Sequence, residues 1–159
     1  MPELPEVETI CRGLRKYALG LKIRDVKVNM PKMTNVPVNQ FRKNLIGARI
    51  KDVLRRAKTI NIQLSNGFWL VIHLKISGQL LYLPKTEPIK KHTHIIFGLS
   101  NGYTLRFWDQ RQFGYMRLFD SPGRDRFMAE LDFGPEPLEK NFTLEMFRGL
   151  LKSRPKSRI

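Results

Sequence analysis

The pattern of hydrophobic and polar residues changes once along the chain, near Gly20. Before that point, apolar residues recur every three or four positions, at Val7, Ile10, Cys11, Leu14 and Ala18. With the same helical spacing, three cations fall on the opposite face, namely Arg12, Arg15 and Lys16. This spacing predicts an amphipathic helix from Pro5 to Leu19, with its apolar face buried and its cations facing water.

After Gly20, apolar and polar residues alternate in short runs, which is typical of β-strands. Examples are Ile23, Val26 and Val28, and later Ile60, Ile62 and Leu64. Asn-Gly pairs at 66–67 and 101–102 lie between such runs, and this dipeptide favours the tight turn of a hairpin. Because a single hairpin is only marginally stable, the strands between Ile23 and Phe119 must pair further. We therefore expect a mainly β fold with flanking helices, an antiparallel β-sandwich or flattened barrel capped by the N-terminal helix.

The chain beyond Asp120 is rich in turn-forming residues, and a second helical periodicity follows. Its apolar residues are Leu144, Phe147, Leu150 and Leu151. They predict a C-terminal helix with Thr143 as its N-cap. The last residues form a basic run, KSRPKSRI. We expect residues 1–152 to form one domain and residues 153–159 to begin a linker to a further C-terminal part. The alternative is a frayed basic tail on a complete domain.

The composition indicates a polyanionic partner. Of the 159 residues, 42% are hydrophobic, which is enough for one domain with a core. Lys and Arg number 29 against 14 Asp and Glu, so the formal net charge is +15. An excess of this size in so short a chain points to nucleic acid. No apolar run approaches the roughly 20 residues of a membrane span, so no membrane partner is expected.

Cysteine and histidine usage narrows the picture further. A lone cysteine, Cys11, cannot form an internal disulfide, and the N-terminus carries acids where a secretory signal would carry lysines. We therefore expect a cytoplasmic location. With one cysteine and three histidines, at His73, His92 and His94, we expect no closed zinc site within this chain. His92 and His94 are interpreted as strand residues.

The first ten residues, MPELPEVETI, contain a candidate nucleophile. Removal of Met1 would make Pro2 a free secondary amine beside the Glu3 carboxylate. An α-amino group has a pKa of about 8, and a secondary amine can form an iminium with an electrophilic carbon. On DNA that carbon would be C1′ of a sugar, with Glu3 as proton donor and Glu6 orienting the amine. The alternative is that the proline and the carboxylates only start the helix.

Basic side chains on neighbouring β segments could bind phosphates. They are Arg55, Arg56, Lys58, His73 and Lys75. Together they could form a phosphate-binding stripe, or they could be the solvated face of a sheet.

The stretch FWDQRQFGY, residues 107–115, holds a second candidate contact with DNA. Arg111 and Phe113 lie two residues apart, so both side chains can point the same way from an extended loop. An arginine with a nearby aromatic can fill a gap in a base stack. The alternative is a packed loop with Phe113 in the core.

The motifs MPELPEVET, RRAK, HLKISG, KHTHIIF, DQRQFG and FGPEPL follow one another in this order. In that order and spacing, the chain resembles the formamidopyrimidine-DNA glycosylase family over essentially all its 159 residues. The resemblance implies a β-sandwich with helices at its ends. It also implies a base excision repair enzyme, a DNA glycosylase and abasic-site lyase. Such enzymes remove oxidised purines (8-oxoguanine and formamidopyrimidines) from double-stranded DNA and then cleave the strand by successive eliminations.

The resemblance also implies roles for single residues. Pro2 would be the nucleophile that forms the Schiff base, Glu3 the general acid, and Glu6 a supporting carboxylate. Lys58 would belong to the catalytic set and, together with His73, would bind phosphates around the damaged nucleotide.

Three residues would occupy the space that a displaced nucleotide leaves in the duplex, namely Arg111, Phe113 and Ile76. Two departures from the family pattern lie among them. Ile76 stands where these enzymes usually carry methionine, and it is a stiffer wedge. Gln110 and Gln112 stand in place of a proline and often a second arginine. Because Arg111 and Phe113 are kept, the chain resembles the formamidopyrimidine branch more closely than the endonuclease VIII branch.

Related enzymes continue with a helix–two-turn–helix module and usually a zinc finger. We expect both, and the zinc, in a C-terminal DNA-binding part beyond Ile159, and no cofactor in this chain. The chain is expected to be a monomer that keeps the nucleophile and binds duplex DNA weakly. Two other classes remain open. One is a non-catalytic basic nucleic-acid-binding module. The other is a small-molecule enzyme with an N-terminal proline base, which the net charge of +15 disfavours.

Overall fold

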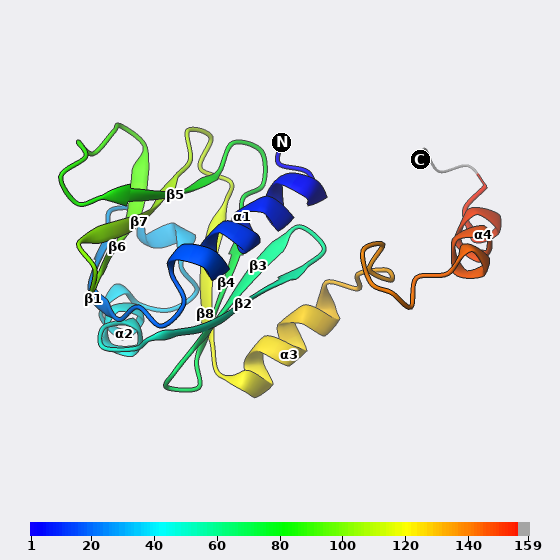
Figure 1. The fold of residues 1–159 in the computed structure, drawn as a ribbon, viewed down its shortest axis with the longest axis horizontal. Coiled ribbons are helices and arrows are strands. Elements are labelled where there is room, and N and C mark those ends of the chain that lie inside the picture. The colour runs from blue at the N-terminus through cyan, green and yellow to red at the C-terminus, as the bar shows by residue number, and fades with distance from the viewer. Residues whose placement is uncertain (156–159) are drawn as a thin grey trace.

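The computed structural model describes residues 1–155, in which two four-stranded antiparallel sheets pack face to face (Figure 1). One sheet has the strand order β1-β6-β7-β5, and the other has the order β2-β3-β4-β8. The strands of the first are β1 (Ile23–Val28), β6 (Thr93–Leu99), β7 (Tyr103–Trp108) and β5 (Gln79–Pro84). Those of the second are β2 (Ile50–Arg56), β3 (Thr59–Leu64), β4 (Trp69–His73) and β8 (Tyr115–Phe119). The expected sandwich is confirmed, and across the described residues the sheets do not close into a barrel.

Both hairpins expected at Asn-Gly pairs are present. The pair at 66–67 joins β3 to β4, and the pair at 101–102 joins β6 to β7. Gly67 has φ +86° and Gly102 has φ +83°, a left-handed conformation that only glycine adopts without strain. Between the sheets, Ile62 and Leu64 of one face Phe97 of the other around a small enclosed space. The alternation predicted from the sequence therefore builds the core.

The N-terminal helix α1 (Leu4–Tyr17) lies against the β2 side of the sandwich. Its Val7, Cys11 and Leu14 are buried, as the spacing predicts. Burial raises the pKa of the Cys11 thiol to about 12, so the thiol stays protonated. Arg15 differs from expectation, because its Nε donates to the carbonyl oxygen of Val53 at 2.6 Å instead of facing only water.

Two helices and one short 3-10 turn were not predicted from the sequence. The 3-10 turn η1 (Pro31–Met33) and helix α2 (Val38–Leu45) follow β1, and α2 buries Phe41 and Leu45, one turn apart. With eight residues, α2 is too short for a clear periodicity.

The other unpredicted helix is α3 (Ser121–Glu130), which buries no residue of its own. Its start is defined by Asp120, whose side chain accepts from the Gly123 backbone N–H at 2.7 Å. Arg124 Nε donates to Asn61 Oδ1 at 3.1 Å, and the Phe127 ring stacks on Phe119 at 4.9 Å between centroids. The helix thus covers the outer face of the β2-β3-β4-β8 sheet.

The predicted C-terminal helix is present as α4 (Leu144–Ser153), and Thr143 accepts from the Met146 backbone N–H at 3.2 Å as its N-cap. Figure 1 shows α4 standing away from the sandwich. Its apolar side chains stay exposed, from 39% at Phe147 to 64% at Leu144, so nothing in the described part of the chain buries them. Residues 156–159 of the predicted linker lie outside the described residues.

The interpretation of His92 and His94 as strand residues is correct for His94 and wrong for His92. His94 lies in β6 and is buried, whereas His92 precedes the strand with φ +68°. Within residues 1–155, no group of histidine, cysteine or acidic side chains is arranged to hold a metal ion. None of the described helices is both long and apolar enough to pass through a membrane.

Candidate active site

Three segments that are distant in sequence meet at one edge of the sandwich. They are the N-terminus of α1, the β4–β5 loop (residues 74–78) and the β7–β8 loop (residues 109–114). Figure 1 shows the N-terminus beside the β4–β5 loop at the upper edge of the molecule, with the β7–β8 loop next along the same edge. A pocket of about 510 Å³ lies between the N-terminus and the β4–β5 loop. It is lined by Met1, Pro2, Glu6 and Ile10, and by Leu74 and residues 76–81. Pro2, Glu6 and Ile76 therefore share one pocket.

The Glu3 carboxylate forms an ion pair with Lys58, with 2.8 Å between Glu3 Oε2 and Lys58 Nζ. Lys58 comes from the turn between β2 and β3, so a residue far along the chain lies beside the N-terminus. The hydrogen bond and positive charge from Lys58 lower the pKa of Glu3. Near neutral pH, Glu3 is therefore ionised.

Glu6 holds the backbone just after Pro2. Its Oε2 accepts from the Glu3 backbone N–H at 2.6 Å, which satisfies one of the free donors at the start of α1. The sequence predicted that Glu6 would orient the amine. The contact supports a related role, because it fixes the direction in which Pro2 leaves the helix.

His73, at the end of β4, is half-buried beside the pocket edge. Its Nδ1 accepts from the Lys75 backbone N–H at 3.0 Å, and its ring lies 5.7 Å from that of Tyr115. Burial, with the nearby charges of Lys75 and Lys58, lowers the pKa of His73 to about 4. Its imidazole is therefore neutral at pH 7 and offers an Nε2–H donor.

The β7–β8 loop presents Arg111 and Phe113 to solvent. Phe113 is 56% exposed, so the alternative that placed it in the core is wrong. The Arg111 guanidinium lies 5.4 Å from the centroid of the Phe113 ring, a cation–π contact. Ile76 on the neighbouring loop is 38% exposed. Three side chains suited to contact bases therefore project from adjacent loops.

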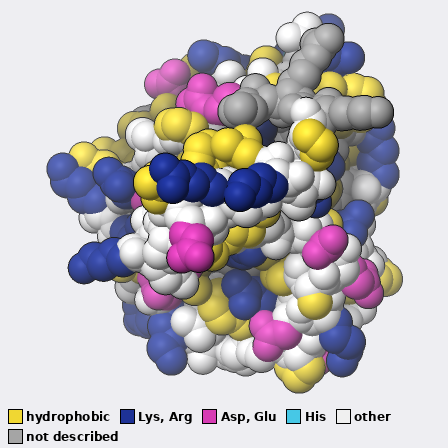
Figure 2. Space-filling model, turned by 90° about the vertical axis from the view of Figure 1, so that its right-hand side faces the viewer, with side chains coloured by type: hydrophobic (Ala, Val, Ile, Leu, Met, Phe, Trp, Pro, Cys, Tyr) yellow, Lys and Arg dark blue, Asp and Glu magenta, His cyan; other side chains and the backbone are white. Residues whose placement is uncertain are grey.

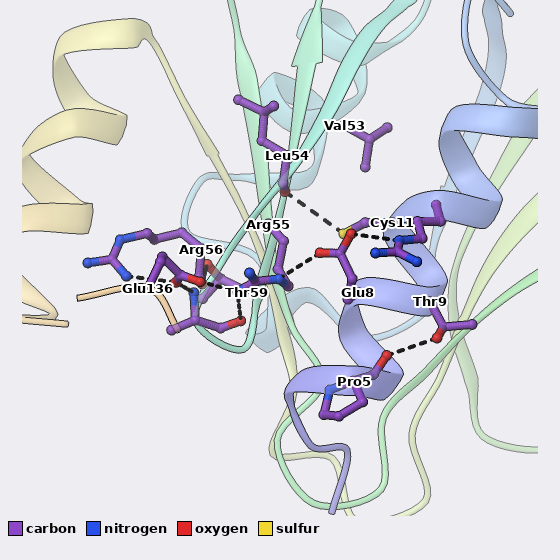
Figure 3. Close-up of polar contacts among 12 residues, drawn as sticks. Pro5, Glu8, Thr9, Cys11, Val53, Leu54, Arg55, Arg56, Thr59 and Glu136 are labelled. Atoms are coloured by element: carbon purple, nitrogen blue, oxygen red, sulfur yellow. Dashed lines mark hydrogen bonds and ion pairs between the residues drawn. The ribbon is translucent and has the colours of Figure 1, made fainter. Parts of the chain in front are cut away.

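Neither alternative for the basic residues, a phosphate stripe or the solvated face of a sheet, fits Arg55 and Arg56, because carboxylates engage both (Figure 3). Arg55 is 6% exposed and contacts Glu8 at 2.8 Å and Glu136 at 2.6 Å. Arg56 contacts Glu136 at 2.7 Å, and its guanidinium also donates to the carbonyl oxygen of Gly134 at 2.8 Å. The interpretation of Arg55 and Arg56 as phosphate ligands is therefore corrected. Their charges tie the segment around Glu136 to the β2–β3 hairpin.

The two carboxylates in this cluster are held in their ionised form. Burial alone would raise the pKa of Glu136, but hydrogen bonds from the Ala57 backbone N–H, Arg56 and Arg55 outweigh it and lower the pKa. The same balance, with Arg55 as the main donor, lowers the pKa of Glu8. No local sequence pattern signalled Glu136, because it lies 80 residues from Arg56.

Cations also lie across the wider surface. Figure 2 shows Lys and Arg side chains, interspersed with a few acids, over the face turned toward the viewer. On this face the cations are therefore spread over the surface and not confined to one pocket.

The fold and the site define a class: a basic two-sheet domain whose candidate site is built around its own N-terminus. Residues 1–116 match the family model described as the formamidopyrimidine-DNA glycosylase N-terminal domain. The chain therefore belongs to the formamidopyrimidine-DNA glycosylase family.

Relatives and solved structures agree with this assignment. The formamidopyrimidine-DNA glycosylase of Pelotomaculum thermopropionicum is 42% identical over 155 residues, covering 97% of this chain and 56% of the relative. That of Streptococcus pneumoniae is 37% identical over 156 residues, covering 98% of this chain and 57% of the relative. The chain thus spans somewhat more than half the length of these relatives.

Among solved structures, Lactococcus lactis Fpg in complex with DNA containing an abasic site superposes with a TM-score of 0.87 at 30% identity. The match covers 95% of this chain and 56% of that one. MutM in complex with DNA containing carbocyclic 8-oxo-G also gives a TM-score of 0.87, at 32% identity, covering 96% of this chain and 57% of that one. Both neighbours were solved with damaged DNA bound.

Proposed function

We propose that this chain is the catalytic N-terminal domain of a DNA glycosylase and strand lyase that removes oxidised purines from duplex DNA. The observation that carries the proposal is the shared pocket of Pro2, Glu6 and Ile76, at the same edge of the sandwich as the Arg111 loop. The fold neighbours bound to abasic-site and 8-oxo-G DNA support the substrate class.

The reaction uses the secondary amine of Pro2, which is an amide nitrogen until Met1 is removed. The amine attacks C1′ while the bond from C1′ to the base breaks, and the base leaves with the bonding electrons and takes a proton from water. The amine then gives its own proton to the ionised Glu3 carboxylate, and Glu3 passes this proton to the ring oxygen as the bond between C1′ and that oxygen opens. An iminium between Pro2 and C1′ results.

The iminium then cleaves the strand. It acidifies the hydrogens on C2′, and loss of one of them as a proton expels the 3′ phosphate. A second elimination expels the 5′ phosphate, and water hydrolyses the remaining iminium to free Pro2. One nitrogen atom thus serves both base release and strand cleavage.

Lys58 holds Glu3 in the form that can accept the amine proton. Its Nζ lies 2.8 Å from Glu3 Oε2, and its hydrogen bond and charge keep the carboxylate ionised. A DNA phosphate competes for Lys58, and its binding frees the Glu3 carboxylate to face the sugar. His73 complements Lys58 as a neutral Nε2–H donor to a second phosphate.

The exposed side chains of the two loops fill the space that the displaced nucleotide leaves. Phe113 and Ile76 supply apolar area, and Arg111 supplies donors for the orphaned base. Gln112, at a position where relatives often carry arginine, accepts from Lys32 Nζ at 3.0 Å. A cation from η1 thus lies beside the loop despite this departure.

The steps above use the Pro2 amine, the Glu3 carboxylate and water, and they call for no metal or cofactor. We place zinc binding and the remaining DNA contacts in a C-terminal part that residues 153–159 lead toward. The chain spans 56% of the Pelotomaculum thermopropionicum relative, which supports this division. We further propose that the domain acts as a monomer.

Borohydride trapping tests the proposal. The chain, shown by intact mass to lack Met1, is incubated with DNA containing 8-oxoguanine and borohydride, which reduces the iminium to a stable amine. We expect a covalent adduct of chain and DNA. A matched chain with one extra residue before Pro2 has a blocked nitrogen and should give none. The absence of an adduct from the Met1-free chain would overturn the proposal. If that chain still binds duplex DNA, it is a non-catalytic binding module.

A further inference from the structure

A buried carboxylate connects the two loops that carry the exposed base-contacting side chains. Asp109 opens the β7–β8 loop and is fully buried. Its Oδ2 accepts from the Gly114 backbone N–H at 2.8 Å, and its Oδ1 accepts from the Arg111 backbone N–H at 3.2 Å. Asp109 therefore closes the loop on itself, with Arg111 and Phe113 on the outside of the closed turn.

Ser77 extends this network to the β4–β5 loop. Its hydroxyl donates to Asp109 Oδ1, and its Oγ accepts from the Arg111 backbone N–H at 2.9 Å. Ser77 is the neighbour of Ile76 in sequence. The position of the Ile76 loop is thus linked by two hydrogen bonds to the position of the Arg111 loop.

The surroundings leave this network little freedom. His94 Nε2 lies 2.8 Å from the Asp109 carbonyl oxygen, and the Asp109 N–H donates to the His92 carbonyl oxygen at 3.0 Å. A Cβ at Gly114 would collide with the Phe107 ring, and a Cβ at Gly78 would overlap the Leu74 carbonyl oxygen. Both loops are therefore packed tightly behind their exposed tips.

The choice of a carboxylate is informative. In the described part of the chain, Asp109 pairs with no lysine or arginine side chain, and burial of an unpaired charge is costly. An ionised carboxylate only accepts, and here it receives donors from Ser77, Arg111 and Gly114. In an asparagine at this position, an NH2 group would replace one carboxylate oxygen. That NH2 group is a donor and would face one of the three donors. The carboxylate thus specifies one conformation of the loop. The exposed side chains of the two loops add little to the hydrophobic core.

We propose that Asp109 and Ser77 are positioning residues that couple the two loops, so that Ile76, Arg111 and Phe113 enter the duplex as one rigid wedge. This proposal rests on the proposed function. Without the coupling, each loop would have to be ordered separately when DNA binds, and ordering costs free energy.

The coupling itself is tested without DNA, by amide hydrogen exchange measured by NMR. In the unmodified chain the Arg111 and Gly114 amides should be protected. Ser77→Ala should lose protection at Arg111, and Asp109→Asn should lose it at both amides. Ser65→Ala is the matched control, because Ser65 also accepts a backbone N–H, from Arg49 at 2.9 Å, at the opposite end of the β3–β4 hairpin. Unprotected Arg111 and Gly114 amides in the unmodified chain would overturn the coupling.

The consequence for DNA is measured as a ratio of two rates. One is excision of 8-oxoguanine from duplex DNA, and the other is borohydride trapping on a single strand with a preformed abasic site, which needs no wedge. We expect Ser77→Ala and Asp109→Asn to lower this ratio about tenfold. Ser77→Thr, which restores the hydroxyl, should recover most of it, and Ser65→Ala should leave it unchanged. The fluorescence rise of 2-aminopurine opposite the lesion, which reports unstacking, should fall in parallel.

The outcomes separate the two proposals. If the unmodified chain traps no abasic DNA, the proposed function fails, and the exchange data alone decide on the coupling. If it traps abasic DNA and both variants keep the normal ratio and fluorescence, the wedge proposal is wrong. Equal losses of both rates in Ser77→Ala would also refute it, since the serine would then act on the Pro2 pocket.

Discussion

At the scale of single residues, the contact between Glu3 and Lys58 lowers the pKa of Glu3 and fixes its carboxylate in place before DNA arrives. The two groups lie 2.8 Å apart and both are partly exposed, so the pair is easily exchanged for other partners. The carboxylate is thus held ionised in the free chain, ready to accept the amine proton. This arrangement links the freedom of Glu3 to the arrival of a phosphate that attracts Lys58.

The Glu3 and Lys58 pair can be tested by NMR titration of a chain with labelled glutamate side chains. In the unmodified chain the pKa of Glu3 should lie below the usual value of about 4.3. In Lys58→Gln it should rise toward that value, because the hydrogen bond and the nearby charge are gone. Lys51→Gln, which removes an exposed lysine on β2, is the control and should change nothing. The same pKa in all three chains would contradict the pairing.

At the same scale, the sequence indicated exposed side chains but not the residues that hold them in place. The sequence pointed to Arg111, Phe113 and Ile76, and all three side chains are exposed on adjacent loops. It did not point to Asp109 or Ser77, which lie behind them. These two residues are 32 positions apart in the chain, and no local pattern connects residues at that separation.

At the scale of elements, hairpins and the first helix followed from local rules, whereas α2 and α3 did not. An Asn-Gly turn or a helical apolar stripe is specified by residues close in sequence. Helix α3 instead buries none of its residues and depends on Arg124 reaching Asn61 of β3 and on Phe127 stacking on Phe119. Its stability comes from the sheet beneath it, so its own sequence carries little signal.

The contact of Glu136 with β2 contributes to the free energy of unfolding, which can be measured. It neutralises Arg55 and Arg56 of β2 and is itself 4% exposed. Glu136→Gln leaves the buried Arg55 and the partly exposed Arg56 with one counter-charge fewer and should lower the free energy of unfolding at pH 7 by about 3 kcal/mol. Urea titration of the variant and the unmodified chain measures this difference.

The pH dependence of that difference has a definite sign. Because folding lowers the pKa of Glu136, its contribution is fully present above the usual carboxyl pKa and is lost as the pH falls through the lowered value. The difference in the free energy of unfolding between the unmodified chain and Glu136→Gln should therefore become smaller toward pH 3. Glu139→Gln, in the same segment but exposed, should stay within about 0.5 kcal/mol of the unmodified chain. Equal urea midpoints for Glu136→Gln and Glu139→Gln would refute this account.

At the scale of the whole molecule, the dominant property is charge. A net charge of +15 on 159 residues favours association with a polyanion at long range, and this attraction weakens with salt. The chain spans 56% of its Pelotomaculum thermopropionicum relative, so fewer phosphate contacts are expected from it than from that full-length protein.

A salt titration compares this chain with the full-length Pelotomaculum thermopropionicum relative. Affinity for duplex DNA with an abasic site is measured by fluorescence anisotropy at several salt concentrations. This chain should bind more weakly than the full-length relative at low salt and should show a shallower slope, since the slope scales with the number of neutralised phosphates. Phe113→Ala should weaken binding without changing the slope, because it removes no charge. Equal affinities and slopes for the two proteins would contradict the expectation that this chain makes fewer phosphate contacts than the full-length relative.

The sequence by itself determined the features that depend on near neighbours or on totals. These are the α1 stripe, the Asn-Gly hairpins, the sandwich class, the net charge and, through ordered motifs, the family. The tertiary structure decided which charges pair with each other. Lys58 pairs with Glu3, whereas Arg55 and Arg56 are engaged by Glu8 and Glu136. The physical reason is that a charge acts on whatever lies within a few ångströms of it, and only folding brings residues 47 to 80 positions apart to that distance.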